Sequence, residues 1–340
     1  MKSLSPDRMP DRRSILVKAL SLLSGLLVAA AVARAQLSER VRRIGYLSGT
    51  DVRMRPNLVE SLRELGWVEG RTITVVGVEG RDFDGQRERA IPLAKDVVAA
   101  KVELIIAVGP AAIRAAMQAT RDIPIVMAAW GGPDLVESGL IASYARPGGN
   151  VTGVDMLLSS LDAKRLNMLH QAVPKATRIA VLVHHRHVFE RERLAVREVA
   201  RKSGLTLEIV ETRDGSISYD DAFAALVRAQ CQALLVLGSP IFERDRKLII
   251  ERAARARLPV IYAGSANAHE GGLIAYGTTG LEIDQLVARQ IDRILRGANP
   301  GDLPIEHPSR FQLVINLATA RALRLQIPQA LLVQADQLIE

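Results

Sequence analysis

The stretch VELIIAVGPAAIRAAMQATRDIPIVMAA (residues 102–129) places two short apolar runs, VELIIAV and IPIVMAA, on either side of a longer segment. Neither run alternates polar with apolar residues, which is typical of strands covered on both faces. Short runs rich in Val and Ile continue to alternate with longer stretches of helical period from residue 43 onward. Strand–helix–strand alternation of this kind predicts an α/β fold with doubly wound parallel sheets.

Two lobes are predicted from the number of strands and from one pause in the rhythm. The expected strands span residues 43–48, 72–78, 102–108, 123–129, 150–156, 177–183, 205–211, 233–238, 258–264 and 272–277. Ten strands are more than we expect in a single sheet for a chain of this length. The rhythm pauses at SYARPGGNVTGVDM (143–156), a segment rich in turn residues, so we expect a lobe boundary near residue 155.

The last part of the chain breaks the alternation. RGANPGDLPIEHPSRFQLVIN (296–316) reads as an extended connection, followed by helices over NLATARALRL (316–325) and PQALLVQADQLIE (328–340). We therefore expect the chain to cross between the lobes more than once. The expected division is 36–155 with about 279–312 for the first lobe, and 156–278 with about 313–340 for the second.

The N-terminus has the parts of a secretory signal. Arg12, Arg13 and Lys18 form a positive region, residues 19–33 are almost wholly apolar, and Ala33-Arg34-Ala35 is a typical cleavage site. The apolar run is shorter than the roughly 20 residues that a membrane-spanning helix needs. We expect residues 1–35 to be a cleaved signal peptide and the protein to be periplasmic. The paired arginines also resemble a twin-arginine signal, so both export routes stay open, as does an anchor or a buried first helix.

Charge and cysteine content limit the partners and the covalent cross-links that the protein can have. The signal carries six basic and two acidic groups, so its removal lowers the formal net charge from +8 to +4. The remaining charges are mixed in sign, and no basic stripe with interleaved aromatic residues is present, which argues against nucleic acid as a partner. About 305 mature residues in a chain with 48% apolar content can bury one large or two medium cores. The single cysteine, Cys231, excludes an internal disulfide and reads as an inert core thiol.

A ligand site is expected at the carboxyl ends of the predicted strands, because ligands of parallel α/β sheets bind there beside helix N-termini. The residues at these ends are small, hydroxylated or aromatic, which suits a small polar or aromatic ligand. The candidate ligand-binding residues are Ser48, Thr50, Gly109, Pro110, Ala111, Trp130, Gly131, Asp155, His184, Ser239, Tyr262, Ser265 and Tyr276. Trp130 has two interpretations, stacking on the ligand or packing under its loop.

Catalytic and cofactor signatures are mostly absent. The chain has no G-x-S-x-G elbow, no phosphate loop ending in Gly-Lys-Ser/Thr and no G-x-G-x-x-G motif. Three histidines, His184, His185 and His187, leave one predicted strand and could bind a metal, although their spacing matches no standard site. We predict no enzyme activity, no cofactor and no metal, with an exported metal-dependent enzyme using these histidines as the alternative.

Several stretches resemble one family. IGYLSG, LRELGWVEGRTI, ARPGGNVTGV, LPVIYAG with GGLIAYG, and the long block ILRGANPGDLPIEHPSRFQLVINLATARALRLQIPQALLVQADQLIE are similar to periplasmic substrate-binding proteins of ABC transporters. The likeness covers about residues 40–340 and points to the branch that binds tryptophan or tyrosine. It implies a type I periplasmic binding fold, in which two Rossmann-like lobes are joined by crossover strands and close on the ligand by a hinge.

The resemblance also implies partners, and this sequence differs from the family's usual pattern at two positions. An ABC permease and its ATPase would receive the ligand, and the binding protein itself would be a monomer. Relatives usually carry Gly-Thr-Pro-Ala after the third strand, whereas here Gly109 is followed directly by Pro110 and Ala111. The usual Asp-Pro after the fourth strand is also altered, because Asp134 follows Pro133.

Two further alternative functions are a sugar-repressor-like regulator, which would need an N-terminal DNA-binding motif, and a sensor partner of a membrane kinase.

Overall fold

The fold is α/β, as predicted. The computed structural model describes residues 41–49, 53–77, 87–131, 134–156, 158–184, 190–212 and 219–340. Each of the ten predicted strands has a counterpart in these ranges, displaced by at most two residues at either end. The predicted signal peptide and the candidate residues Thr50, His185 and His187 lie outside the described residues.

The first sheet has five parallel strands in the order β2-β1-β3-β4-β5. Its elements are β1 (Arg42–Ser48), α2 (Pro56–Glu64), β2 (Ile73–Gly77), α3 (Arg87–Ala99), β3 (Leu104–Val108), α4 (Gly109–Ala119), β4 (Ile125–Trp130) and β5 (Val151–Asp155). Separate apolar clusters cover its two faces, one built around Ile105 and Met127 and the other around Ile106 and Val126. This double coverage explains why the central strands read as continuous apolar runs.

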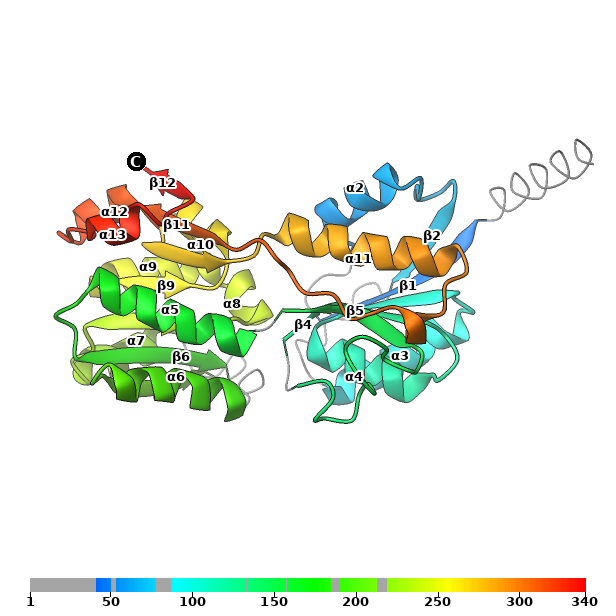
Figure 1. The fold of residues 1–340 in the computed structure, drawn as a ribbon, viewed down its shortest axis with the longest axis horizontal. Coiled ribbons are helices and arrows are strands. Elements are labelled where there is room, and N and C mark those ends of the chain that lie inside the picture. The colour runs from blue at the N-terminus through cyan, green and yellow to red at the C-terminus, as the bar shows by residue number, and fades with distance from the viewer. Residues whose placement is uncertain are drawn as a thin grey trace, which may run out of the picture.

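The second sheet has seven strands in the order β12-β11-β10-β9-β8-β6-β7. Its first elements are α5 (Leu158–Ala172), β6 (Arg178–His184), α6 (Glu190–Lys202), β7 (Thr206–Thr212), α7 (Tyr219–Arg228), β8 (Ala233–Val236), α8 (Pro240–Arg244), α9 (Arg246–Ala256), β9 (Val260–Tyr262), α10 (Ser265–His269) and β10 (Ile274–Gly277). Figure 1 shows the two sheets side by side along the long axis, with the carboxyl end of β6 and helix α8 directed toward the first sheet.

After β10 the chain returns to the first sheet. Helix α11 (Gly280–Leu295) packs against its β4 and β5 and against α2, burying Leu286, Val287 and Ile291. A short 3₁₀ turn, η1 (Pro300–Asp302), follows, and residues 303–306 run beside β5. We call residues 42–155 with 280–306 lobe 1, and residues 158–277 with 312–339 lobe 2. Sheet membership supports the predicted domain division, which stays a prediction.

The C-terminal prediction was partly wrong. The end of the expected connection is a strand, β11 (Gln312–Asn316), which pairs antiparallel with β10. Only α12 (Leu317–Ala322) and α13 (Gln329–Leu332) are helical, and the last residues form β12 (Gln337–Ile339) beside β11. Asp336 accepts a hydrogen bond from the Leu313 amide at 2.7 Å and so directs the final residues onto the sheet edge.

Two further features of the described residues concern the membrane and the cysteine. No helix within the described ranges is long and apolar enough to span a bilayer. Cys231 is buried beside β8, and burial raises the pKa of its thiol, which disfavours the reactive thiolate.

Candidate functional site

The parallel register of lobe 1 brings several predicted site residues to one edge. Ser48 is the register partner of Val108, which precedes Gly109, and Trp130 is the partner of Asp155. These residues therefore lie at the carboxyl ends of four adjacent strands, along the same edge of the sheet. The strand ends of the two lobes point toward each other in Figure 1.

A bulge near the end of β4 decides where Trp130 points. The register with β5 shifts between Met127 and Trp130, and Ala129 has a φ of 71°, a left-handed conformation that is strained for alanine. The extra residue reverses the alternation, so Trp130 enters the same apolar cluster as Met127. The indole is 0% exposed, and the Arg114 guanidinium lies 5.4 Å from its ring centroid. Packing is therefore the better interpretation of Trp130, and we leave it out of the ligand-contacting set.

Helix α4 begins at the same edge. Gly109 has a φ of 80°, which lets the chain turn from β3 directly into the helix, and Pro110 occupies the first turn. In the part of the chain that the structure describes, no side chain caps this helix start. Backbone N–H groups of an uncapped first turn attract an anion such as a carboxylate.

Asp155 carries the acidic group of this edge. It is 6% exposed, and the hydroxyl of Tyr144 lies 3.2 Å from its Oδ2 and 3.1 Å from Asp134 Oδ2. Burial and the nearby Asp155 carboxylate both raise the pKa of Tyr144, so this hydroxyl remains a donor. Asp134 also accepts the amides of Val136 and Glu137 at 2.9 and 3.0 Å, which makes it a turn-capping residue here.

The strand ends of lobe 2 hold the remaining predicted residues in different ways. Ser239 caps α8 by accepting the Ile241 amide at 3.3 Å, and Ser265 begins α10. Tyr276 ends in a hydroxyl that accepts a hydrogen bond from Lys164 Nζ at 2.6 Å. Tyr262 is 2% exposed within an apolar cluster, so its predicted place in the ligand site is not favoured.

The strongest polar feature of lobe 2 was missed by the sequence analysis. Arg165 is 1% exposed and forms an ion pair with buried Asp162 at 2.5 Å. Its Nε donates to the Tyr276 carbonyl at 2.7 Å, and Nη2 lies 3.4 Å from the Ala263 carbonyl. One guanidinium thus ties α5 to the ends of β9 and β10. In the sequence this pair is an ordinary Asp–Arg spacing of three on a helix, and nothing there signals its burial.

Of the three histidines in the cluster, His184 lies in the described part of the chain. Groups of three or more His, Cys, Asp or Glu residues that could hold a metal are absent from the described ranges. His184 is 2% exposed and packs edge-on against Phe242, with ring centroids 6.1 Å apart. The neighbours His185 and His187 fall outside those ranges.

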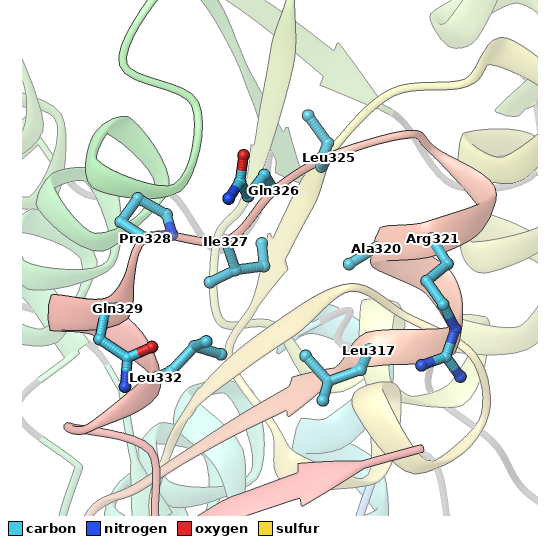
Figure 2. A pocket seen from close by; sticks show the side chains of 9 residues that line it. All are labelled: Leu317, Ala320, Arg321, Leu325, Gln326, Ile327, Pro328, Gln329 and Leu332. Atoms are coloured by element: carbon cyan, nitrogen blue, oxygen red, sulfur yellow. The ribbon is translucent and has the colours of Figure 1, made fainter.

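A hollow of about 570 Å³ lies away from these strand ends, between α12 and α13. Figure 2 shows Leu317, Ile327 and Leu332 lining it, with Arg321 and Gln329 at its sides. None of the predicted site residues lines this hollow.

Glu282 at the start of α11 connects two of the chain segments that pass between the lobes. Its Oε1 accepts the amides of Ser309 and Arg310 at 2.8 and 3.0 Å, and its Oε2 accepts the Thr278 hydroxyl at 3.0 Å. Burial alone would raise the pKa of Glu282, but these hydrogen bonds outweigh it and leave the pKa lowered. The segments 278–279 and 307–311 are therefore held together where the chain passes between the lobes.

The comparison with known proteins agrees with this architecture. Residues 52–339 match the family described as ABC transporter substrate binding protein. The chain belongs to the ABC transporter substrate-binding protein family. Proteins of this family bind small molecules and work with a permease and an ATPase, and they are solute-binding proteins rather than enzymes. The alternative of a metal-dependent enzyme has no support in these matches.

Individual relatives of this substrate-binding protein are distant but cover most of the chain. A tyrosine-binding protein of Clostridioides difficile (strain R20291) is 26% identical over 274 residues, which is 80% of this chain and 76% of the relative. A conserved domain protein from Vibrio cholerae O1 biovar eltor has a TM-score of 0.75 at 22% identity, covering 88% of this chain and all of that one. An ABC domain from Streptococcus pneumonia, solved in complex with L-Trp, has a TM-score of 0.72 with the same identity and coverage.

Proposed function

We propose that this substrate-binding protein captures an aromatic amino acid, tryptophan or tyrosine, between the strand ends of its two lobes. The tyrosine-binding relative and the structure solved with L-Trp support the ligand class. The predicted export signal supports an extracytoplasmic protein that is cleaved near Ala35 and delivers its ligand to a membrane permease, and we propose that this protein is a monomer.

One observation carries the ligand class on this chain. The uncapped start of α4 follows β3, and Asp155 ends β5, with β4 between them. Strands lie about 4.8 Å apart, so the two groups are separated by roughly 10 Å at the same edge. The helix start attracts a carboxylate, and the Asp155 carboxylate attracts an ammonium group. An amino acid carries both groups on one carbon.

The remaining proposed contacts come from both lobes. Lobe 1 contributes Ser48, Pro110, Ala111 and Gly131 beside Gly109 and Asp155, and lobe 2 contributes Ser239, Ser265 and Tyr276. The ligand then bridges two bodies joined by the hinge, so that its binding energy favours the closed arrangement.

Isothermal titration calorimetry of the mature protein with L-tryptophan, L-tyrosine, benzoate and L-leucine tests this proposal. We expect saturable binding of the aromatic amino acids, and loss of most of that affinity in Asp155→Asn. Ser138→Ala is the matched control, because among the described residues this hydroxyl bonds only within its own turn. Binding of leucine or benzoate in preference to both aromatic amino acids would contradict the proposed ligand class.

A further inference from the structure

Glu243 is a carboxylate on the ligand-facing edge of lobe 2 that the sequence analysis did not single out. It belongs to α8, which follows the carboxyl end of β8 and lies at the end of lobe 2 nearest lobe 1 (Figure 1). The carboxylate rests directly on the chain after β9, because a Cβ added to Gly264 would lie 2.8 Å from Glu243 Oε1. Glycine at position 264 therefore makes room for this group beside Ser265.

The carboxylate has unused hydrogen-bonding capacity. Asn267 Nδ2 lies 3.3 Å from each of its oxygens, and the same amide also donates to the Gly264 carbonyl at 3.0 Å. No other hydrogen bond or ion pair reaches the Glu243 carboxylate from the residues that the structure describes. A carboxylate has about four acceptor positions, so most of them are left for another donor.

The surroundings of the Glu243 carboxylate make it unfavourable in free energy to leave these acceptor positions without a donor. Burial raises the pKa of Glu243, although the charges of Arg246 and Arg165 act in the opposite direction. A partly desolvated carboxylate gains a strong hydrogen bond from a donor brought to it and is penalised when an apolar group covers it. Glu243 therefore discriminates between ligands that do and do not bring a donor to this edge.

We propose that Glu243 accepts a hydrogen bond from the donor on the ligand's aromatic ring, and so selects tyrosine or tryptophan over phenylalanine. This inference rests on the proposed function, in which lobe 1 holds the α-carboxylate and the ammonium group. The ring then extends toward lobe 2, where the phenol O–H or the indole N–H meets the carboxylate. Phenylalanine would cover the carboxylate with a ring edge that has no N–H or O–H donor.

The test is a calorimetric titration of L-tyrosine, L-tryptophan and L-phenylalanine into the wild type and the Glu243→Leu variant. In the wild type we expect phenylalanine to bind at least about 10-fold more weakly than tyrosine. In Glu243→Leu we expect tyrosine and tryptophan to weaken by roughly 10- to 100-fold, while phenylalanine keeps or gains affinity. Opposite changes for the two kinds of ligand are not produced by general damage to the fold.

Controls keep the outcome decisive. Glu251→Gln removes an exposed carboxylate from α9 of the same lobe and should change none of the three affinities. Glu243→Gln keeps the size and one acceptor oxygen, so it tests the charge should the leucine variant not fold, and should weaken tyrosine by about 3- to 10-fold. An equal loss of affinity for all three ligands, or no loss for any of them, would overturn the proposed role of Glu243 but not the proposed function. A wild-type protein that binds none of them would overturn the proposed function as well.

Discussion

Trp130 and Asp155 are register partners at the ends of β4 and β5, yet their side chains serve different purposes. The bulge after Met127 turns the indole into the core of lobe 1, whereas the Asp155 carboxylate stays beside the hydroxyl of Tyr144. The proposed ligand edge of lobe 1 is therefore polar and has no aromatic surface from this tryptophan on which a ligand could stack.

Substitution of Trp130 should affect stability and not ligand affinity. Trp130→Phe removes buried volume, so we expect the free energy of unfolding to fall by about 1–3 kcal/mol in urea denaturation. The dissociation constant for the ligand should stay within about twofold, because the ring has no exposed surface. A tenfold loss of affinity in a variant of unchanged stability would restore the stacking interpretation.

Gly153 is the residue on β5 that the bulge requires. Its φ is 138°, and an added Cβ would lie 2.3 Å from the Met127 carbonyl oxygen. Gly153→Ala should therefore lower the free energy of unfolding by about 3 kcal/mol or more, since both the conformation and the space oppose a side chain. Gly149→Ala is the matched control, because an added Cβ there has no neighbour within 4 Å. Equal stability of the two variants would show that β4 and β5 are arranged differently.

The buried pair of Arg165 and Asp162 should be sensitive to the loss of one partner. Arg165→Met leaves the Asp162 carboxylate buried without its cation, and the expected cost is about 3–5 kcal/mol in unfolding free energy. The double variant Arg165→Met with Asp162→Leu should recover a large part of that loss, because no unpaired charge remains. A single variant that costs less than 1 kcal/mol, or a double variant less stable than the single one, would contradict the buried geometry.

Glu282 should make the hinge sensitive to acid. Its pKa is lowered in the folded protein, so the stability that its hydrogen bonds contribute is present above the unfolded pKa of about 4.3 and is lost as pH falls through the lower folded value. We expect the melting temperature of Glu282→Gln to lie below that of the wild type at pH 7, with the gap closing below pH 4. Thermal denaturation followed by circular dichroism between pH 3 and pH 7 measures this gap. A gap that is as wide at pH 3 as at pH 7 would show that the carboxylate charge plays no part.

The class of fold could be predicted from the sequence because strand and helix periods are local properties. The apolar run 104–107 is buried along its whole length, as its composition indicates. The antiparallel strand β11 and the final strand β12 were not predicted as strands, because their pairing depends on residues more than 20 positions apart. Pairing of that kind leaves little trace in a short window of sequence.

The candidate site was predictable as a region and less so as a set of side chains. Strand ends gather by topology, which is why Gly109 and Asp155 share an edge. The direction of Trp130 depends on one extra residue in a bulge. The burial of Arg165 and the partial burial of Glu243 depend on how α5 and α8 pack. Neither the bulge nor the helix packing leaves a periodic signal in the sequence. The placement of these three side chains could therefore be learned only from the structure.

Hydrogen–deuterium exchange of the mature protein, with and without saturating L-tryptophan or L-tyrosine, tests most directly whether the ligand is held between the two strand-end edges. We expect slower exchange on ligand addition in the first turn of α4 and around residues 153–156 of lobe 1, together with α8 and residues 263–266 of lobe 2. Slower exchange confined to one lobe, or to the hollow between α12 and α13, would contradict this expectation.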